Sequence, residues 1–568
     1  MARALTSGAR QGSARADSGR ATIATGGRFA AATAAIVVSL LAVSGAGGSG
    51  AQTPRVGGTV VFGPLEPEPA CLNPLLARCN YESSGPAILF IGEKVLQTAF
   101  DVGPGFTFRP RLVSRVTFTR KPPFTLTYHI RPEARWSDGV PITARDFIFT
   151  HRARIARKAE LPREEKALLD RVSRVSALDA KTVRVVLRSR FSGWRTLFGN
   201  ILPRHALAGE DLAKIWTDRI DNPNTGRPIG SGPFLVERWQ RGRQLTLVRN
   251  PRYWGAHPAY LDRLVLRFRP EGDDPVAWFR RGEVDVGYGF VGGVPALRRE
   301  PGLKVVAAPS SSWDHFAIRV GPGGHPALRN KLVRRALAYG IDRAALVRQV
   351  LGNFPPELRP LDSVVFLIQS RYHRPNWGAY RYRPAHARRL LEQAGCRRGA
   401  DGIYSCAGER LSLRFLTTAG IPPRERLLAL AQAQLRQAGV EVVPTFAPPR
   451  ALFDTILPSG DFDVVLFGWG FDPNPVGATS IFGCGGIQNF TGYCQRLATR
   501  DLDQAGRILD AAAQARVLNR ADAQIARDVP VIPLFQIPLP AAHRATVRNF
   551  VLHPFNPISN AEEWWLAR

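Results

Sequence analysis

Residues 136–147 read WSDGVPITARDF, and this is the most distinctive segment of the 568-residue chain. The Asp-Gly pair at 138–139 favours a tight turn, because glycine accepts backbone conformations that other residues avoid. Thr143 and Asp146 have the spacing of a capping box, in which two side chains bond the free backbone N–H groups at the start of a helix. The segment therefore predicts a turn that leads into a helix, with a structural rather than a ligand-binding role.

The flanking sequence predicts both strands and helices. Alternating or continuous apolar runs predict strands at 57–62, 124–130, 182–187, 244–248, 264–268 and 440–443. Helical periodicity, with glycine after the last periodic residue, predicts helices over 328–339, 384–394 and 424–438, and one that Asp342 caps and that ends near Gly352. This mixture has no repeat of fixed period, so it predicts a large α/β protein with more than one core.

The first 51 residues have the organisation of a leader. A basic start is followed by an apolar run over 29–43 and by small residues over 44–51. These are the parts of a secretory signal peptide, and the run is shorter than the ~20 residues that a membrane span requires. We expect residues 1–51 to be a signal peptide and basic leader that directs export. An uncleaved leader that anchors the protein in the membrane is the alternative.

The cysteines agree with export. Six cysteines stand in three close pairs: Cys71 with Cys79, Cys396 with Cys406, and Cys484 with Cys494. An even number in an exported chain favours disulfides, whereas a zinc site needs tighter pairs such as C-x-x-C. Six cysteines can pair in several ways, and of these we predict the local pairing.

The formal net charge is +31, which raises the question of an anionic partner. The basic residues are spread along the whole chain, and no dense run is interleaved with aromatic residues as a nucleic-acid track would require. We therefore expect no nucleic-acid partner. A weak electrostatic contact with an anionic cell envelope is expected instead.

The sequence lacks the common catalytic and phosphate-binding motifs. It has no H-E-x-x-H helix, no G-x-S-x-G elbow and no G-x-x-x-x-G-K-[ST] loop. The neighbouring acids Asp461 and Asp463 are typical of a turn and a cap. We expect no enzymatic activity, no cofactor and no metal.

The segment 136–147 closely resembles the W-x-D-G-x-P-[LI]-T-A-x-D signature of the peptide-type solute-binding proteins of ABC importers. Seven further segments resemble motifs of this family in the same order: 228–234 (PIGSGPF), 249–255 (RNPRYWG), 282–285 (GEVD), 333–343 (VRRALAYGIDR), 387–395 (ARRLLEQAG), 461–473 (DFD, GW and DP) and 529–535 (VPVIPLF). Ser231 stands where the family usually has Thr, and Gly340 where it usually has Ala. The resemblance covers nearly all of residues 57–568, and the chain is identified as a member of family 5 of the extracytoplasmic solute-binding proteins.

The resemblance implies an α/β fold with two lobes, of the type II-like periplasmic-binding-protein class, hinged by two chain crossings. We expect the crossings near 308–312 and 529–534. The first lobe would comprise 57–308 and 535–568, with an extra subdomain at about 100–224, and the second lobe would comprise 313–528.

The implied function is that of a monomeric receptor. It would capture a peptide or a similar small solute by hinge closure and deliver it to the membrane subunits of an ABC permease. The protein would work in the periplasm or at the outer face of the cell envelope.

The resemblance also implies ligand-binding residues in the cleft. The family's Asp after Gly-Trp pairs with the ligand α-ammonium, and Asp472 matches it; the alternative is that Asp472 caps the turn before Pro473. Trp469 and Gly470 are expected in the cleft, although Trp469 could instead fill the core. Two loops complete the expected site: the one carrying Asn489, braced by Cys484–Cys494, and the one that ends at Asn73, stiffened by Cys71–Cys79.

Two other functions are compatible with the sequence. The same fold could bind a non-peptide solute such as a sugar, a nickel chelate or an opine. The protein could also be an envelope-associated binding or chaperone protein that takes no part in transport. The ordered motifs favour the importer receptor, because they predict a hinged cleft.

Overall fold

The computed structural model describes residues 53–65, 68–76, 79, 92–161, 163–268, 274–289, 293–352, 354, 358–471 and 477–567. The chain divides into two units, residues 1–53 and 54–568, and the description below concerns the second. The predicted leader at 1–51 lies outside the described residues, and its role stays a prediction. Within the ranges given above, no helix is both long enough and apolar enough to span a bilayer.

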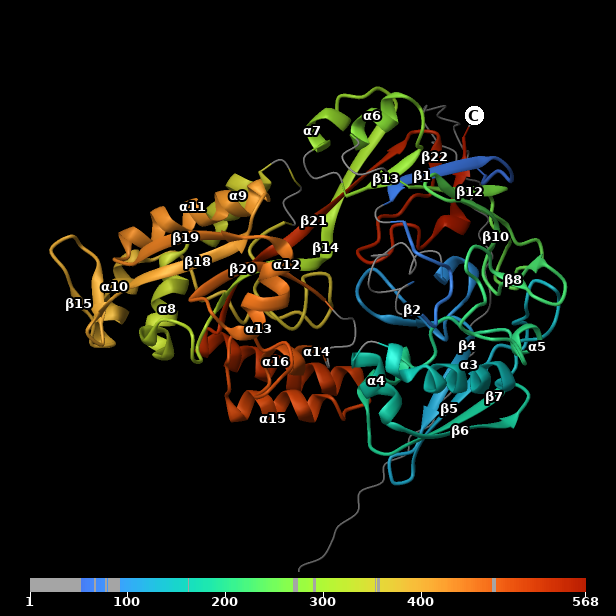
Figure 1. The fold of residues 1–568 in the computed structure, drawn as a ribbon, viewed down its shortest axis with the longest axis horizontal. Coiled ribbons are helices and arrows are strands. Elements are labelled where there is room, and N and C mark those ends of the chain that lie inside the picture. Colours follow the sequence, from blue (N-terminus) through green and yellow to red (C-terminus); the bar gives the residue numbers. More distant parts are fainter. Residues whose placement is uncertain are drawn as a thin grey trace, which may run out of the picture. The chain divides into compact units, whose positions relative to one another are not determined.

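A ten-stranded sheet runs through the second unit (Figure 1). Its strands follow the order β10-β11-β12-β1-β13-β21-β14-β20-β18-β19. Their bounds are β1 (Thr59–Leu65), β10 (Phe234–Gln240), β11 (Gln244–Arg249), β12 (Arg263–Phe268), β13 (Val286–Tyr288), β14 (Leu303–Ile318), β18 (Ser412–Thr418), β19 (Glu441–Ala447), β20 (Val464–Gly470) and β21 (Val531–Arg544). The strands predicted at 57–62, 244–248, 264–268 and 440–443 are confirmed as β1, β11, β12 and β19.

Two long strands lie at the middle of this sheet. β14 and β21 pair antiparallel from Leu303 opposite Arg544 to Ala317 opposite Val531, and Figure 1 shows them side by side. Their register is irregular between Pro309 and Trp313. Pro309 lies opposite Pro538, and neither residue has an N–H to donate to the ladder, which explains the loosening at this point.

This irregular register falls at the first predicted crossing, near 308–312. The residues opposite it on β21 are 536–539, and both crossings stay predictions.

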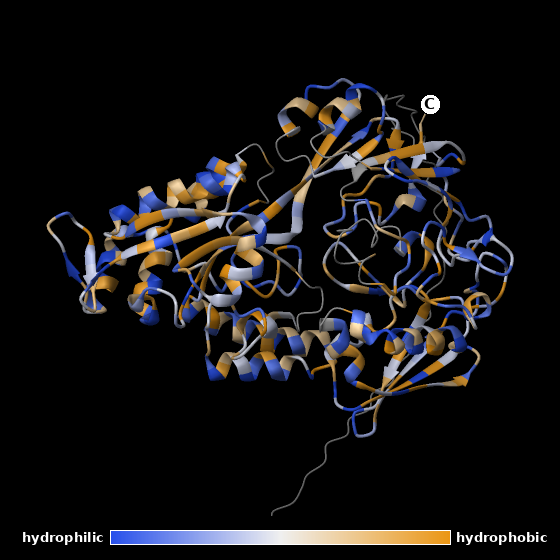
Figure 2. Cartoon of the chain, in the orientation of Figure 1, coloured by the Kyte–Doolittle hydropathy of each residue, from blue (hydrophilic) through white to orange (hydrophobic). Residues whose placement is uncertain are grey.

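Two large hydrophobic cores lie in the unit. The first core is built from residues between 60 and 286 and between 547 and 564. The second core is built from residues between 313 and 535, together with Phe106. Figure 2 shows hydrophobic residues along the central strands, and helices whose faces alternate between hydrophobic and hydrophilic. Each core is therefore formed mainly by one half of the sequence.

A second, four-stranded sheet contributes to the first core. Its strands are β4 (Val113–Phe118), β5 (Phe124–Ile130), β7 (Thr182–Leu187) and β6 (Val172–Asp179), in that order. Helix α3 (Ala144–Ala156) packs against it and begins with the predicted capping box: the Thr143 N–H donates to Asp146 Oδ2 at 2.8 Å, and Arg145 N donates to Thr143 Oγ1 at 3.3 Å. Trp136 is fully buried, so the segment 136–147 has the structural role that its sequence predicts.

Helices cover the rest of the second unit. They are α4 (Arg163–Asp170), α5 (Arg204–Leu207), α6 (Pro275–Arg280), α7 (Val294–Leu297), α8 (Lys331–Gly340), α9 (Arg343–Leu351), α10 (Pro384–Gln393), α11 (Pro422–Gln437), α12 (Pro449–Ala451), α13 (Leu457–Ser459), α14 (Gly477–Phe482), α15 (Arg496–Ala505) and α16 (Ala511–Asp528). Asp342 caps α9 by accepting from Ala345 N at 2.9 Å, and Gly352 ends it, as predicted. The helix predicted over 328–339 begins later, at Lys331, because Asn330 accepts from Leu332 N and caps it there.

Short elements complete the chain. The single-turn helices are η1 (Lys158–Glu160), η2 (Ser192–Thr196), η4 (Pro326–Arg329), η5 (Leu452–Ile456) and η6 (Ala561–Glu563). The short strands are β2 (Phe100–Val102), β3 (Phe108–Pro110), β8 (Asp221–Asn222), β9 (Arg227–Pro228), β15 (Arg397–Arg398), β16 (Tyr404–Cys406), β17 (Glu409–Arg410), β22 (Val547–Arg548) and β23 (Trp565–Leu566).

The six cysteines form three local disulfides, which join Cys71 to Cys79, Cys396 to Cys406, and Cys484 to Cys494.

Candidate functional site

A cavity of about 160 Å³ lies between segments from the two halves of the chain. The residues from the first half are Phe106, Thr107, Phe108, Ser192 and Arg195, and those from the second half are Phe366, Ser370, Arg371, Tyr372, Phe471, Ala511 and Gln514. A solute bound here would touch both halves at once. This is the property that a receptor closing around its ligand requires.

The hairpin formed by β2 and β3 carries Phe106 into this cavity. Phe106 N donates to Gly103 O at 2.9 Å, and Gly103 N donates to Thr107 O at 2.8 Å, which closes a tight turn with a positive φ of 58° at Phe106. The Phe106 ring is 8% exposed; its centroid lies 4.9 Å from that of Phe471 and 5.1 Å from that of Phe555. A residue from the first half of the chain therefore packs into the second core.

A direct hydrogen bond also joins the two halves beside the cavity. Ser192 N, at the start of η2, donates to Gly506 O at 2.9 Å, just after α15. Arg195 follows in the same turn, and its guanidinium stacks over the Trp194 ring at 4.2 Å. On the opposite side, Arg371 Nη2 donates to the Tyr372 hydroxyl at 2.6 Å. The cavity wall thus includes one arginine from each half.

The structure places Trp469 and Gly470 at the end of β20, just before Phe471. Trp469 is partly buried against the second core, and its ring stacks on Phe490 with centroids 5.8 Å apart. Gly470 is exposed, and a Cβ at this position would meet no heavy atom within 4 Å. Trp469 therefore packs against the core in this arrangement, and its place in the cleft and its contact with a solute stay predictions. Asp472 lies outside the described residues.

The Asn489 side chain bonds within its own loop. Its Nδ2 donates to Gly483 O at 2.9 Å and to Tyr493 O at 2.5 Å, and its Oδ1 accepts from the Thr491 hydroxyl at 2.9 Å. Both amide hydrogens are therefore used to hold the loop that the Cys484–Cys494 disulfide closes. In this arrangement the side chain orders the loop, and a ligand contact by Asn489 stays a prediction.

Asn73 is likewise committed to its own surroundings. The residue is fully buried; Nδ2 donates to Leu212 O at 2.8 Å and to Ile215 O at 3.2 Å, and Oδ1 accepts from Leu75 N at 2.9 Å. The structure therefore does not bring the Asn73 side chain to the cavity. A contact with the solute through the backbone of this early loop stays a prediction.

A buried ion pair and an uncharged histidine involve β14, at the positions opposite Phe467 and Gly468 on β20, just before Trp469. Asp314 Oδ1 accepts from Arg424 Nη2 at 2.8 Å, and both side chains are largely buried. Burial, with a smaller contribution from Arg424, lowers the pKa of the adjacent His315 to about 3. His315 is therefore neutral at physiological pH and packs among aromatic rings, with the Phe467 centroid 4.6 Å away.

The acids Asp461 and Asp463 have structural roles, as their spacing predicts. Asp463 accepts from His325 N at 2.7 Å and from Arg414 N at 2.8 Å, and Asp461 pairs with the Arg414 guanidinium. Across the described part of the chain, no three His, Cys, Asp or Glu side chains gather in a way that could hold a metal ion.

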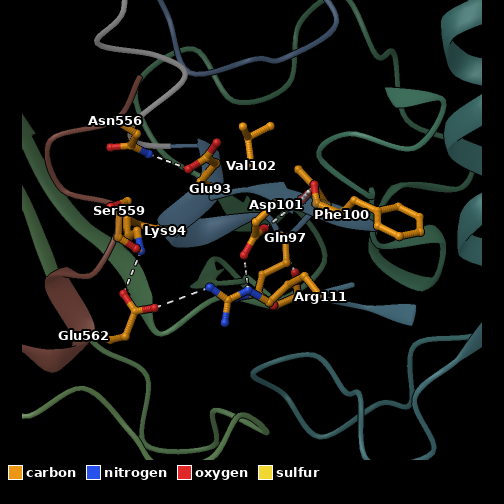
Figure 3. Close-up of polar contacts among 12 residues, drawn as sticks. Glu93, Lys94, Gln97, Phe100, Asp101, Val102, Arg111, Asn556, Ser559 and Glu562 are labelled. Atoms are coloured by element: carbon orange, nitrogen blue, oxygen red, sulfur yellow. Dashed lines mark hydrogen bonds and ion pairs between the residues drawn. The ribbon is translucent and has the colours of Figure 1, made fainter. Parts of the chain in front are cut away.

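A second polar cavity, of about 440 Å³, lies at the base of the β2–β3 hairpin. Figure 3 shows its polar contacts, in which Lys94 pairs with Glu562, Arg111 binds Asp101, and the Asn556 amide donates to Glu93. The Lys94–Glu562 pair is buried, with Nζ 2.6 Å from Oε2, whereas Arg111 and Asp101 are half-buried. Burial, helped by the nearby Asp101 carboxylate, raises the pKa of Glu93 to about 7. This cluster holds the C-terminal segment against the first core.

Glu93→Gln should stabilise the protein in a pH-dependent way. Between pH 4.5 and 7 the folded protein keeps a proton on Glu93 that the unfolded chain has lost, so the stability of the wild type falls as pH rises through this window. The glutamine variant does not lose stability in this way. Its free energy of unfolding, relative to that of the wild type, should rise from near zero below pH 4.5 to about 3 kcal/mol above pH 7. Urea unfolding across this range measures it, and an advantage that does not change with pH would contradict the assignment.

Sequence reasoning missed most of the residues that line the cavity. Phe106, Arg195 and Arg371 belong to none of the eight motif segments, and they lie in short turns and loops far apart in the chain. The one local signal is that Arg195 follows Trp194 and Arg371 precedes Tyr372, which is compatible with stacking.

Comparisons with known proteins agree with this architecture. A sequence model of the family described as "Bacterial extracellular solute-binding proteins, family 5 Middle" matches residues 107–489. The oligopeptide-binding protein OppA of Mycobacterium tuberculosis is 29% identical over 464 residues, which cover 80% of this chain and 76% of OppA. The oligopeptide-binding protein AppA of Bacillus subtilis is 25% identical over 454 residues, which cover 77% of this chain and 80% of AppA.

Two solved structures share the fold over most of the chain. The periplasmic EDTA-binding protein EppA superposes with a TM-score of 0.75 at 24% identity, covering 91% of this chain and 98% of EppA. AppA from Bacillus subtilis, in complex with a nonapeptide, superposes with a TM-score of 0.67 at 22% identity, covering 91% of this chain and all of AppA. The predicted two-lobe α/β fold is confirmed.

Proposed function

Because the chain belongs to the bacterial extracellular solute-binding proteins of family 5, we propose that it is the extracytoplasmic receptor of an ABC importer and that its solute is a peptide or a similar small molecule. It is exported under the direction of residues 1–51 and works in the periplasm or at the outer face of the cell envelope. It binds its solute without transforming it and passes it to the membrane subunits of a permease.

The cavity lined from both halves of the chain is the observation that carries this proposal. The first lobe comprises 57–308 and 535–568, with a subdomain at about 100–224, and the second comprises 313–528. The chain passes between them along β14 and β21, where the facing prolines Pro309 and Pro538 weaken the ladder. Rotation about this point opens and closes the cavity, and a solute that touches both lobes favours the closed state.

Native mass spectrometry of the exported protein, followed by thermal shift with a random nonapeptide library, tests the proposal. A peptide present at ~100 times its dissociation constant should add about 2.7 kcal/mol of stability. A co-purified sugar or metal chelate would keep the receptor function and replace the peptide. A protein that carries nothing and is stabilised by no peptide, sugar or chelate would contradict the receptor function.

Asp472→Ala should weaken peptide binding by about tenfold or more, with the melting temperature of the free protein unchanged. The reason is that a carboxylate in a closed cleft loses its charge-assisted bond to the peptide α-ammonium. Asp461→Ala is the matched control, because Asp461 is a largely exposed acid that precedes β20 and pairs with Arg414. Calorimetry with the peptide and its N-acetyl form checks the anchor. If Asp472→Ala lowers the affinity for both forms equally, an α-ammonium contact is excluded.

A further inference from the structure

A single histidine joins two segments whose phenylalanine rings pack against the second core. His553 is 4% exposed, and its Nε2 lies 2.9 Å from Val102 O at the end of β2. On the other side of the ring, Nδ1 accepts from Phe555 N and from Asn556 N, each at 3.2 Å. The ring therefore bonds the β2–β3 hairpin and its own turn, residues 553–556, at the same time.

These contacts fix the protonation state of the ring. A nitrogen that accepts a hydrogen bond carries no proton, so the single proton of the neutral imidazole lies on Nε2, where it donates to Val102 O. Burial lowers the pKa of His553 to about 4, and the cations Lys94 and Arg109 act in the same direction. The bond to Val102 O and the Asp101 carboxylate oppose this shift in part. The ring is therefore neutral at physiological pH, in the form that makes all three bonds.

Each segment that His553 bonds carries a phenylalanine to the second core. Phe106 lies at the tip of the hairpin, with its ring centroid 5.1 Å from that of Phe555 and 4.9 Å from that of Phe471. Phe555 also packs against the second core. A shift of the hairpin or of the turn would separate these rings, and His553 links the backbones of both.

The turn also contacts β14 where the register of that strand is irregular. Ser311 N donates to Pro554 O at 3.4 Å, and Ser311 O accepts from Phe471 N at 2.7 Å. The Asn556 amide joins the same turn to Glu93 (Figure 3). The turn is thus held between the hairpin, the charged cluster and the proposed crossing on β14.

We propose that His553 is a positioning residue for solute capture, whose neutral ring holds Phe106 and Phe555 where they meet the second lobe. It acts through these two rings rather than by contact with the solute. Closure depends on the fit between the lobes, so a displaced hairpin lowers the population of the closed state and with it the apparent affinity for the solute. The inference rests on the proposed receptor function and adds a residue that controls its closure.

Two substitutions each keep one part of the bonding of His553. In His553→Asn, the amide oxygen still accepts from the N–H groups of the turn, whereas the bond to Val102 O is lost. In His553→Gln, the amide nitrogen still donates to Val102 O, whereas the bonds from the turn are lost. Hydrogen exchange of the full protein should therefore become about tenfold or more faster at the hairpin amides 103–106 in the first variant, and at the amides of Phe555 and Asn556 in the second.

Calorimetry with the tightest-binding nonapeptide from a random library tests the effect on solute capture. Both variants should bind it about tenfold or more weakly, at a temperature where each is fully folded. In the Phe106→Ala background, His553→Asn should change the affinity by less than about twofold, because the ring through which it acts is absent. A histidine with a structural role alone would give the same loss in both backgrounds. His553→Gln gives a second reading if the asparagine variant does not fold.

His543→Asn is the matched control. His543 is 8% exposed, its Nδ1 lies 3.0 Å from Arg544 O, and its ring packs on Phe550 with centroids 5.1 Å apart. Its replacement removes the contacts of another buried histidine and should lower the stability of the protein. The exchange rates of the hairpin and the affinity for the nonapeptide should stay at their wild-type values.

The outcomes separate this inference from the function on which it rests. Wild-type exchange rates in both His553 variants, or equal losses of affinity with and without the Phe106 ring, would overturn the positioning role and leave the receptor function standing. If a sugar or a chelate proves to be the solute, the same calorimetry uses it in place of the nonapeptide. Failure of the wild type to bind any peptide, sugar or chelate would overturn the receptor function itself, whereas the exchange rates would still test the bonds of His553.

Discussion

Phe106→Ala should destabilise the protein by ~3–5 kcal/mol and weaken solute capture by about tenfold or more. The ring is nearly buried between Phe471 and Phe555, so its removal leaves a cavity in the contact between the lobes. The same ring forms a wall of the cavity between the lobes, and its loss admits water to that cavity.

Calorimetry and urea unfolding measure the two effects of Phe106→Ala separately. Phe106→Leu should keep most of the stability, because it replaces much of the lost volume. Phe118→Ala is the matched control, because Phe118 lies in β4 and is 43% exposed. Solute binding by Phe106→Ala at the wild-type affinity would show that the hairpin has no part in the site.

Lys94→Met should lower the free energy of unfolding by ~3–5 kcal/mol, because it leaves the Glu562 carboxylate buried without its main partner. Lys94 Nζ donates to Glu562 and to Ser559 O, and both charged side chains are over 90% buried. Arg111 Nη2 remains 3.6 Å from Glu562 and only partly compensates for the lost ammonium.

Urea unfolding of a short series of variants checks the Lys94 prediction. The double variant Lys94→Met/Glu562→Gln should lose less stability than Lys94→Met alone, since it removes the unpaired charge. Lys214→Met should change stability by less than about 0.5 kcal/mol, because Lys214 is 84% exposed where it pairs with Asp211. A double variant as unstable as, or less stable than, Lys94→Met would contradict this account.

The charged cluster and the interlobe cavity are linked through the β2–β3 hairpin. Asp101 in β2 binds Arg111, and His553 Nε2 lies 2.9 Å from Val102 O. The same hairpin carries Phe106 at its tip, four residues further on. The cluster therefore fixes the base of the hairpin, and through it the position of the ring that meets the second lobe.

Local features followed from the sequence because they depend on neighbouring residues. The Thr143–Asp146 capping box, the Asp342 cap and the strand at 124–130 are each specified by residues a few positions apart, and the structure confirms all three. The three disulfides also followed from the sequence, because each joins cysteines only eight or ten residues apart.

The hydrogen bonds of the expected site residues did not follow from the motif resemblance. It identified the loops of Asn73 and Asn489, but in both residues the amide hydrogens are already bonded to nearby carbonyls. A motif shows where a loop lies in the fold. It does not show which polar atoms remain free, because that depends on every neighbour within hydrogen-bonding distance.

The sequence by itself identified the family and, through the resemblance of its ordered motifs, the two-lobe α/β fold; the receptor function is proposed from the same resemblance. Only the tertiary structure decided that Phe106, Arg195, Arg371 and Phe471 share one cavity, and that burial raises the pKa of Glu93 to about 7. These properties depend on contacts between residues that are hundreds of positions apart in the chain. Burial and charge act through space, so they become defined only when the chain has folded.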